Sequence, residues 1–137
     1  MATLSKSDVE RFHPDGFLGP IRAFSPEAMD QFAEGVATIL SGKDGSHHRH
    51  LDSRAIYEMC ASPEIVGKSS GISGPDIMLW ASNFFVKYPG ARETPWHQDQ
   101  NTGVPAVLEP PLNVSVWLAI DEVRAANSCM KFLLAPI

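Results

Sequence analysis

The spacing of hydrophobic residues changes once along the chain, near Asp76, and this change constrains the fold more than any other feature. Before it, apolar side chains recur every three or four residues, which is typical of one face of a helix. After it, the run from Ile77 to Tyr88 is rich in β-branched and aromatic residues, as strands are. Because helices come first and strands follow, we predict an α+β fold with antiparallel pairing.

Helix-start signals mark the first half of the chain. Ser7-Asp8-Val9-Glu10 has the spacing of a capping box. Ser25-Pro26-Glu27 combines a cap, a first-turn proline and an acidic residue at the positive end of the helix dipole. Ser53 and Ser62-Pro63-Glu64 predict two more helices, so we expect residues 1–73 to be mainly helical. The helix after Ser25 carries one apolar stripe of Met29, Phe32, Ala33, Val36, Ile39 and Leu40.

Strands are expected over most of residues 74–137. The run 77–88 lacks polar alternation, so we predict a strand covered on both faces and ended by a turn at Pro89-Gly90. Leu112–Ile120 alternates between an apolar and a mixed face, and Cys129–Leu134 predicts a further strand. A chain of 137 residues has the size of about one domain. We therefore predict a single domain over 1–137, whose sheet is incomplete.

Charge and hydropathy exclude several classes of protein. Eleven Lys and Arg against sixteen Asp and Glu give a net charge of −5, so the chain lacks the basic surface of a nucleic-acid-binding protein. No apolar run approaches the roughly 18 residues of a membrane span, and the N-terminus lacks the apolar core of a signal peptide. We expect a cytoplasmic protein with no nucleic-acid or membrane partner.

His97 and Asp99 are the sharpest chemical feature. In an extended segment, residues two positions apart point to the same side, so an imidazole nitrogen and a carboxylate oxygen would lie together. This pair is two-thirds of the facial triad of two histidines and one carboxylate that holds Fe(II). The alternative is a chance pair on a surface turn.

Several strings around this pair resemble the phytanoyl-CoA dioxygenase family. The strings are Gly74-Pro75-Asp76-Ile77, Ser82-Asn83-Phe84-Phe85-Val86-Lys87-Tyr88-Pro89-Gly90, Pro95-Trp96-His97-Gln98-Asp99, Val114-Ser115-Val116-Trp117-Leu118-Ala119-Ile120-Asp121 and Asn127-Ser128-Cys129-Met130. The segment Asp15–Pro20 and the segment Arg49–Pro63 also resemble bacterial members. The resemblance therefore covers nearly the whole chain.

The resemblance implies helices followed by part of a double-stranded β-helix, a jelly-roll of about eight strands. It also implies an Fe(II)- and 2-oxoglutarate-dependent dioxygenase, supported by ascorbate. Such an enzyme uses molecular oxygen to couple decarboxylation of 2-oxoglutarate to C–H hydroxylation of a small or lipid-like substrate. On the matching positions, His97 and Asp99 would bind iron, and Trp117, Asn83 and Lys87 would line the 2-oxoglutarate pocket. The alternatives are a core role for Trp117 and a strand-end charge for Lys87.

The family also uses a later His as third iron ligand and a later Arg for 2-oxoglutarate. No His follows His97 here, and the one later Arg is Arg124, so we expect a domain truncated before these residues and impaired in turnover. One alternative is an inactive remnant or interaction fragment that associates through its open sheet edge at Cys129–Leu134. A weaker alternative is a cupin-like or zinc-binding module.

The polar loop Ser46-His47-His48-Arg49-His50 holds three of the five histidines. We interpret it as a solvated loop, with adventitious binding of Zn, Ni or Cu as the alternative, because no nearby Cys or carboxylate completes a metal site. The sequence predicts neither the substrate nor the oligomeric state.

Overall fold

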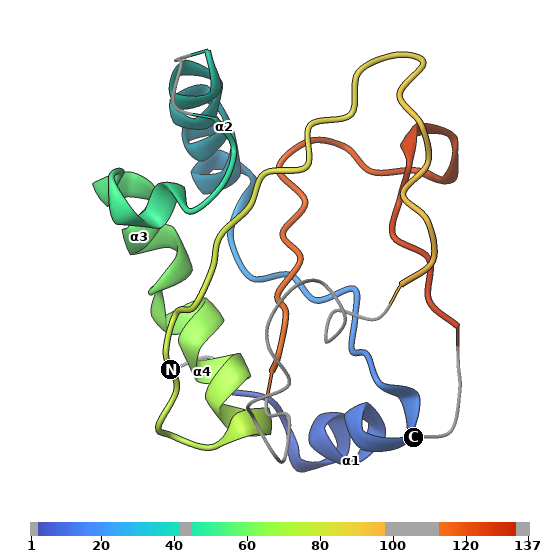
Figure 1. The fold of residues 1–137 in the computed structure, drawn as a ribbon. Helices are drawn as coiled ribbons and strands as arrows, with labels where there is room; N and C mark the ends of the chain where they lie inside the picture. Colours follow the sequence, from blue (N-terminus) through green and yellow to red (C-terminus); the bar gives the residue numbers. More distant parts are fainter. Residues whose placement is uncertain (1–2, 42–44, 98–112, 134–137) are drawn as a thin grey trace.

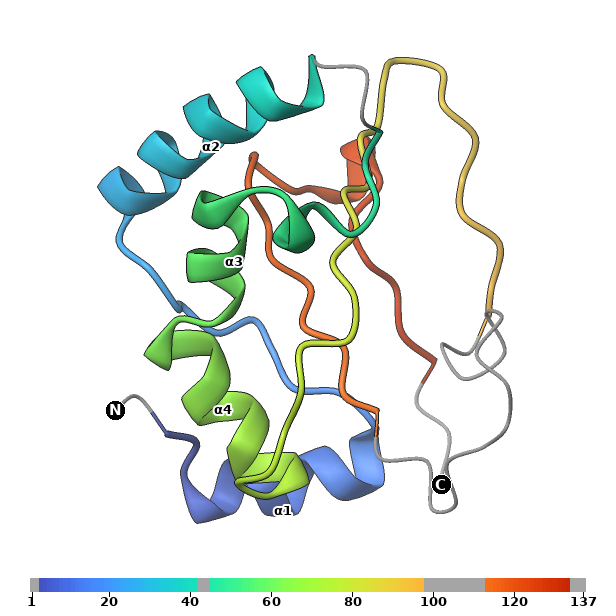
Figure 2. The ribbon, with the colours of Figure 1, turned by 60° about the vertical axis from the view of Figure 1, so that its left-hand side comes forward.

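The computed structural model describes residues 3–41, 45–97 and 113–133. In chain order its elements are α1 (Lys6–Asp15), α2 (Pro26–Leu40), the 3₁₀ turn η1 (Arg49–Leu51), α3 (Arg54–Cys60), α4 (Pro63–Ser73) and the 3₁₀ turn η3 (Ala125–Asn127). In Figures 1 and 2, helices α2, α3 and α4 follow one another along one side and α1 lies at one end. Residues 75–97 and 113–133 run beside them as extended chain.

The predicted α+β fold with part of a jelly-roll is wrong for the described ranges. They contain four α-helices and two 3₁₀ turns, with no β-strand. A helix pairs its own N–H and C=O groups, whereas a strand needs a neighbouring segment in register. The described extended chain finds such a partner only at the isolated antiparallel bridge between His47 and Asn83. The described residues of the predicted strands thus lack ladder pairing.

Helix α2 matches its prediction closely. The Ser25 hydroxyl accepts a hydrogen bond from the Ala28 N–H at 3.2 Å, and Pro26 occupies the first turn. Each residue of the predicted stripe is buried or half-buried, with Val36 at its centre. Helix α3 contacts α2, α4 and η1 and contributes the buried Ile56. The apolar core therefore lies where α2 and α3 meet.

Helix α1 begins two residues earlier than predicted. Its capping box joins Ser5 and Asp8: the Ser5 hydroxyl accepts from the Asp8 N–H at 3.1 Å, and the Ser5 N–H donates to the Asp8 carboxylate at 3.2 Å. The Ser5 hydroxyl also donates to the Asp8 carboxylate at 2.6 Å, and this bond and the one from the Ser5 N–H hold the pKa of Asp8 below its ordinary value. Ser7, the predicted cap, is inside the helix. The sequence contains two overlapping Ser-x-x-acidic motifs, Ser5 to Asp8 and Ser7 to Glu10, and the first of them forms the capping box.

The extended segments leave many apolar side chains exposed. Met78 is 75% exposed and Phe85 68%, so the predicted coverage of residues 77–88 on both faces is wrong. Residues 113–120 alternate only in part: Val114 and Leu118 are half-buried, but Val116, on the same predicted face, is 50% exposed, and Trp117 is exposed to a similar degree. The expected edge strand is also not formed over residues 129–133. In that segment, the ring of Phe132 stacks on Phe17 with centroids 4.4 Å apart.

Two serine caps give a matched test of local stability. Ser25 bonds to the α2 backbone, so Ser25→Ala is expected to lower the free energy of unfolding by about 1 kcal/mol. Ser62 precedes α4, but its buried hydroxyl makes no hydrogen bond within the described part of the chain. Ser62→Ala is therefore expected to change stability by less than about 0.5 kcal/mol, or to raise it. Urea unfolding measures both, and equal losses in the two variants would contradict the assignment.

Candidate functional site

A tight turn precedes the first predicted iron ligand. The Ala91 N–H donates to the Tyr88 carbonyl at 2.9 Å, and Gly90 has φ 80°. Proline followed by glycine with positive φ is the pattern of a type II turn, so the predicted turn is present. Beyond it, the Lys87 ammonium donates to the Thr94 hydroxyl at 2.9 Å. The turn thus brings Lys87 into contact with Thr94, which lies three residues before His97 in the sequence.

His97 is exposed, and its Nδ1 lies 2.8 Å from the Pro95 carbonyl oxygen. A carbonyl only accepts hydrogen bonds, so Nδ1 carries a proton and donates. In the neutral ring, the lone pair is then on Nε2. Metal-binding histidines commonly have this arrangement, with the second nitrogen donating to a backbone carbonyl. Asp99 lies outside the described residues, so the shared face of the pair stays a prediction.

The part of the chain that the structure describes contains no complete metal site. Across residues 3–41, 45–97 and 113–133, no three His, Cys, Asp or Glu side chains form a group that could hold a metal ion. Arg124, the one arginine after His97, pairs with Glu122 on the exposed turn before η3. Of the two predicted iron ligands, the described residues therefore include His97 alone.

Asn83 lies opposite His47 in the isolated bridge. The His48 N–H donates to the Ser82 carbonyl at 2.6 Å, and the Phe84 N–H donates to the Ser46 carbonyl at 2.9 Å. These two bonds flank the pair without joining its own backbone groups, so His47 and Asn83 form a non-hydrogen-bonded pair with neighbouring side chains. Both side chains are exposed.

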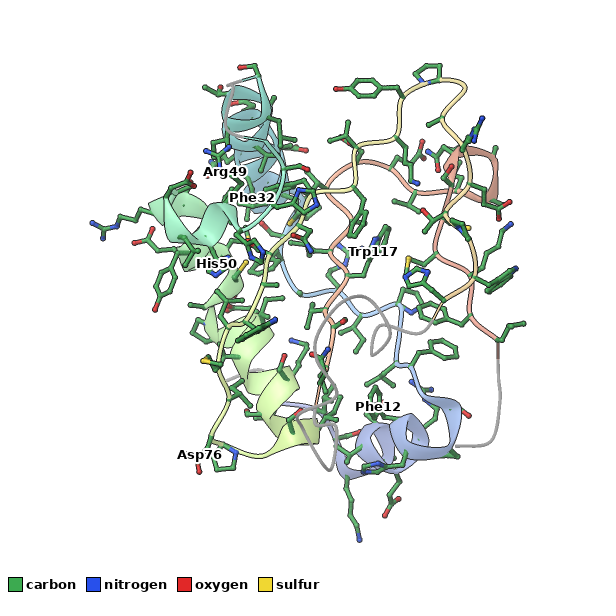
Figure 3. All side chains as sticks on the ribbon, in the orientation of Figure 1. Phe12, Phe32, Arg49, His50, Asp76 and Trp117 are labelled. Atoms are coloured by element: carbon green, nitrogen blue, oxygen red, sulfur yellow. The ribbon has the colours of Figure 1, made fainter. Side chains whose placement is uncertain are left out.

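Trp117 is on a different extended segment, between the helices and the turn that leads to His97 (Figure 3). It is 43% exposed, so the alternative of a core tryptophan is wrong. Among the described residues, no hydrogen bond or ring contact joins Trp117 to Asn83 or Lys87. Lys87 is exposed too, which fits both a ligand-facing ammonium and a solvated charge. The structure thus brings Lys87 beside Thr94 and Asn83 opposite His47.

An exposed ion pair ties the C-terminal described segment to the chain before His97. Lys131 donates to Glu93, four residues before His97. Hydrogen bonding and charge attraction from Lys131 lower the pKa of Glu93, and the pKa of Lys131 is raised in return. Since both side chains are in water, salt screens this pair, and it contributes little to stability.

The loop over residues 45–50 is the feature that the sequence analysis missed. His47 and His48 are exposed as predicted, but Arg49 is only 7% exposed and His50 only 8%. Arg49 Nε donates to both carboxylate oxygens of Asp52, at 2.9 and 3.2 Å. Its Nη1 donates to the Ile39 and Gly45 carbonyls at 3.4 and 3.2 Å. Arg49 thus binds the last turn of α2 to the loop.

His50 makes the matching contact on the other side of the loop. Its Nδ1 lies 2.7 Å from the Ser82 hydroxyl, and its backbone N–H donates to the same oxygen at 3.2 Å. Figure 3 shows Arg49 beside α2 and His50 beside α3. The pairing of Arg49 with Asp52 is visible in the sequence as opposite charges three residues apart, whereas Ser82 is 32 positions from His50.

Comparison with known proteins places this arrangement in a class of oxygenases. The family model described as phytanoyl-CoA dioxygenase (PhyH) matches residues 12–133. The chain belongs to this dioxygenase family, as the resemblance of its strings indicated. Searches of curated proteins and of solved structures gave no match. Among the described helices, none has the length and apolar character to cross a membrane.

The Arg49 cluster gives a prediction about stability. Arg49→Ala is expected to lower the free energy of unfolding by about 2 kcal/mol, because it removes charged hydrogen bonds to two carbonyls and a carboxylate. Arg49→Lys is expected to keep only part of that free energy, since an ammonium lacks the planar set of N–H donors that a guanidinium has. Asp52→Asn is expected to cost less, because the Asp52 side chain is 52% exposed. Urea unfolding would contradict the account if Arg49→Ala matched the wild type.

Proposed function

We propose that His97 and Asp99 are two iron ligands of an Fe(II)- and 2-oxoglutarate-dependent dioxygenase site. Asn83, Lys87 and Trp117 are the residues proposed to contact 2-oxoglutarate. The reaction proposed for such a site is C–H hydroxylation of a small or lipid-like substrate with molecular oxygen, supported by ascorbate. Membership of the phytanoyl-CoA dioxygenase family supports the class of reaction.

The hydrogen bond between His97 and Pro95 carries the proposal for iron. With the proton on Nδ1 and directed at the Pro95 carbonyl, the ring is oriented and Nε2 has the lone pair that a metal needs. Asp99, two positions on, would add a carboxylate oxygen on the same side if the chain stays extended. Nitrogen and carboxylate donors of this kind suit non-haem Fe(II).

The accessibility of Lys87 and Asn83 supports a role toward 2-oxoglutarate, a dianion. The Lys87 ammonium is in water near the returning chain, and it could exchange its bond with Thr94 for a carboxylate. The Asn83 amide could donate to a carboxylate as well. When bound, iron and 2-oxoglutarate supply the oxidation, in which one atom of O₂ enters succinate and the other enters the substrate.

The number of ligands limits what this chain does alone. Among the described residues, His97 is in no group of three potential metal ligands, and Arg124 pairs with Glu122 on an exposed turn. We propose that the chain binds Fe(II) weakly and that robust turnover requires a third ligand.

Metal binding tests the role of His97. Anaerobic calorimetric titration with Fe(II), with and without 2-oxoglutarate, is expected to show at least about tenfold weaker binding for His97→Ala, because a directly bound nitrogen is lost. His47→Ala is the matched control, since His47 is also an exposed histidine on extended chain. Unchanged affinity in His97→Ala, or an equal loss in His47→Ala, would refute the proposed site.

Turnover tests the ligand count separately. With Fe(II), ascorbate, oxygen and 2-oxoglutarate, the purified chain is expected to release little succinate, because it presents two of the three family iron ligands. Succinate is measured against a sample without iron. Robust succinate release by the pure monomer would contradict the requirement for a third ligand.

A further inference from the structure

We infer that His50 is a positioning residue, which acts through Ser82 to hold Asn83 where it can contact 2-oxoglutarate. The inference goes beyond the iron ligands but rests on the proposed function, in which Asn83 is a contact of 2-oxoglutarate. It starts from three observations: the burial of His50, its two contacts with one hydroxyl, and the bridge that joins residues 46–48 to residues 82–84.

The Ser82 hydroxyl makes two contacts with a single residue, His50. It accepts from the His50 backbone N–H at 3.2 Å and faces His50 Nδ1 at 2.7 Å. A serine hydroxyl has one proton and two lone pairs, so it can make both contacts at once. Because His50 is buried, water competes poorly for these bonds. The side chain of Ser82 is therefore fixed, and with it the backbone at this point.

The backbone on both sides of Asn83 is fixed as well. The Ser82 carbonyl accepts from the His48 N–H, and the Phe84 N–H donates to the Ser46 carbonyl. Asn83 itself makes no side-chain hydrogen bond within the described part of the chain, and its amide is exposed. Because its backbone is fixed and its amide donors are accessible, the Asn83 side chain is preorganised to bind a ligand.

The loop that provides His50 is anchored independently of Ser82. Arg49, the preceding residue, binds Asp52 and the Ile39 and Gly45 carbonyls. The position of His50 is thus set from the side of α2 and α3. The contact with Ser82 transmits that position to the segment that carries Asn83.

Amide hydrogen exchange tests the holding of the backbone without any ligand. In Ser82→Ala and His50→Leu, exchange of the His48 and Phe84 amides is expected to rise about five- to tenfold, the factor for one lost hydrogen bond. The double variant is expected to match Ser82→Ala, because that change already removes both contacts with the hydroxyl, whereas His50→Leu removes only the Nδ1 contact. His50→Asn is expected to restore slow exchange, since its amide can reach the position of Nδ1. His48→Asn is the control, because His48 is exposed and Asn tolerates its left-handed backbone, φ 54°.

Binding of 2-oxoglutarate tests the functional part. With Zn(II) as a diamagnetic substitute for iron, 2-oxoglutarate is titrated while the side-chain amide resonance of Asn83 is followed by NMR. We expect a ligand-dependent shift in the wild type, about five- to tenfold weaker binding in Ser82→Ala and His50→Leu, and recovery in His50→Asn.

The outcomes separate the two claims. Unchanged amide exchange in Ser82→Ala and His50→Leu overturns the positioning role of His50, whatever the ligand does. Faster amide exchange in these variants with unchanged affinity for 2-oxoglutarate would mean that His50 has only a structural role, and it also overturns the positioning role. Absence of any Asn83 shift in the wild type refutes the proposed function at Asn83, and with it the role that His50 would have there.

Discussion

Burial of Arg49 and His50 between the helices and residues 82–84 is the interaction on which the described structure depends. Within the described ranges, the buried hydrophobic side chains are Val36 and Ile56, which lie in α2 and α3 on either side of this loop. A guanidinium is costly to bury unless its donors are paired, and Asp52 and two carbonyls pair them. Directional polar contacts thus set the register between helices and extended chain.

The helices could be predicted because their signals are local. Ser25 and Pro26 start α2, and its apolar stripe is buried at the helical period. Helix α1 starts two residues earlier than predicted because Ser5 and Ser7 are each followed, three residues later, by an acidic residue that could complete a capping box. The sequence alone does not rank two such motifs, since the choice depends on which side chain reaches the backbone N–H.

The strands could not be predicted in the same way, because pairing is not a local property. Residues 77–88 have strand composition and an extended backbone, yet Met78 and Phe85 are exposed and the segment meets one short partner, at residues 46–48. Composition indicates how a segment is shaped, whereas a neighbour in register decides whether it becomes a strand. The polar loop around His50 was misread for a related reason: its burial depends on Ser82, far away in the sequence.

The candidate site was predictable to the extent that its chemistry is local. The turn at Pro89-Gly90 and the approach of Lys87 to Thr94 follow from neighbouring residues. The contact of His97 Nδ1 is with Pro95, two positions before it, and it supports the proposal of His97 as an iron ligand. By contrast, the pairing of His47 with Asn83 required the fold.

The nitrogen resonances of the His97 imidazole test the central claim most directly. In ¹⁵N NMR of the metal-free chain, at a pH where the ring is neutral, His97 is expected to have its proton on Nδ1. Addition of Zn(II) is expected to shift Nε2 while Nδ1 stays protonated. A proton on Nε2 in the metal-free chain, or a metal-induced shift confined to His47 and His48, would contradict the assignment of His97 as a metal ligand.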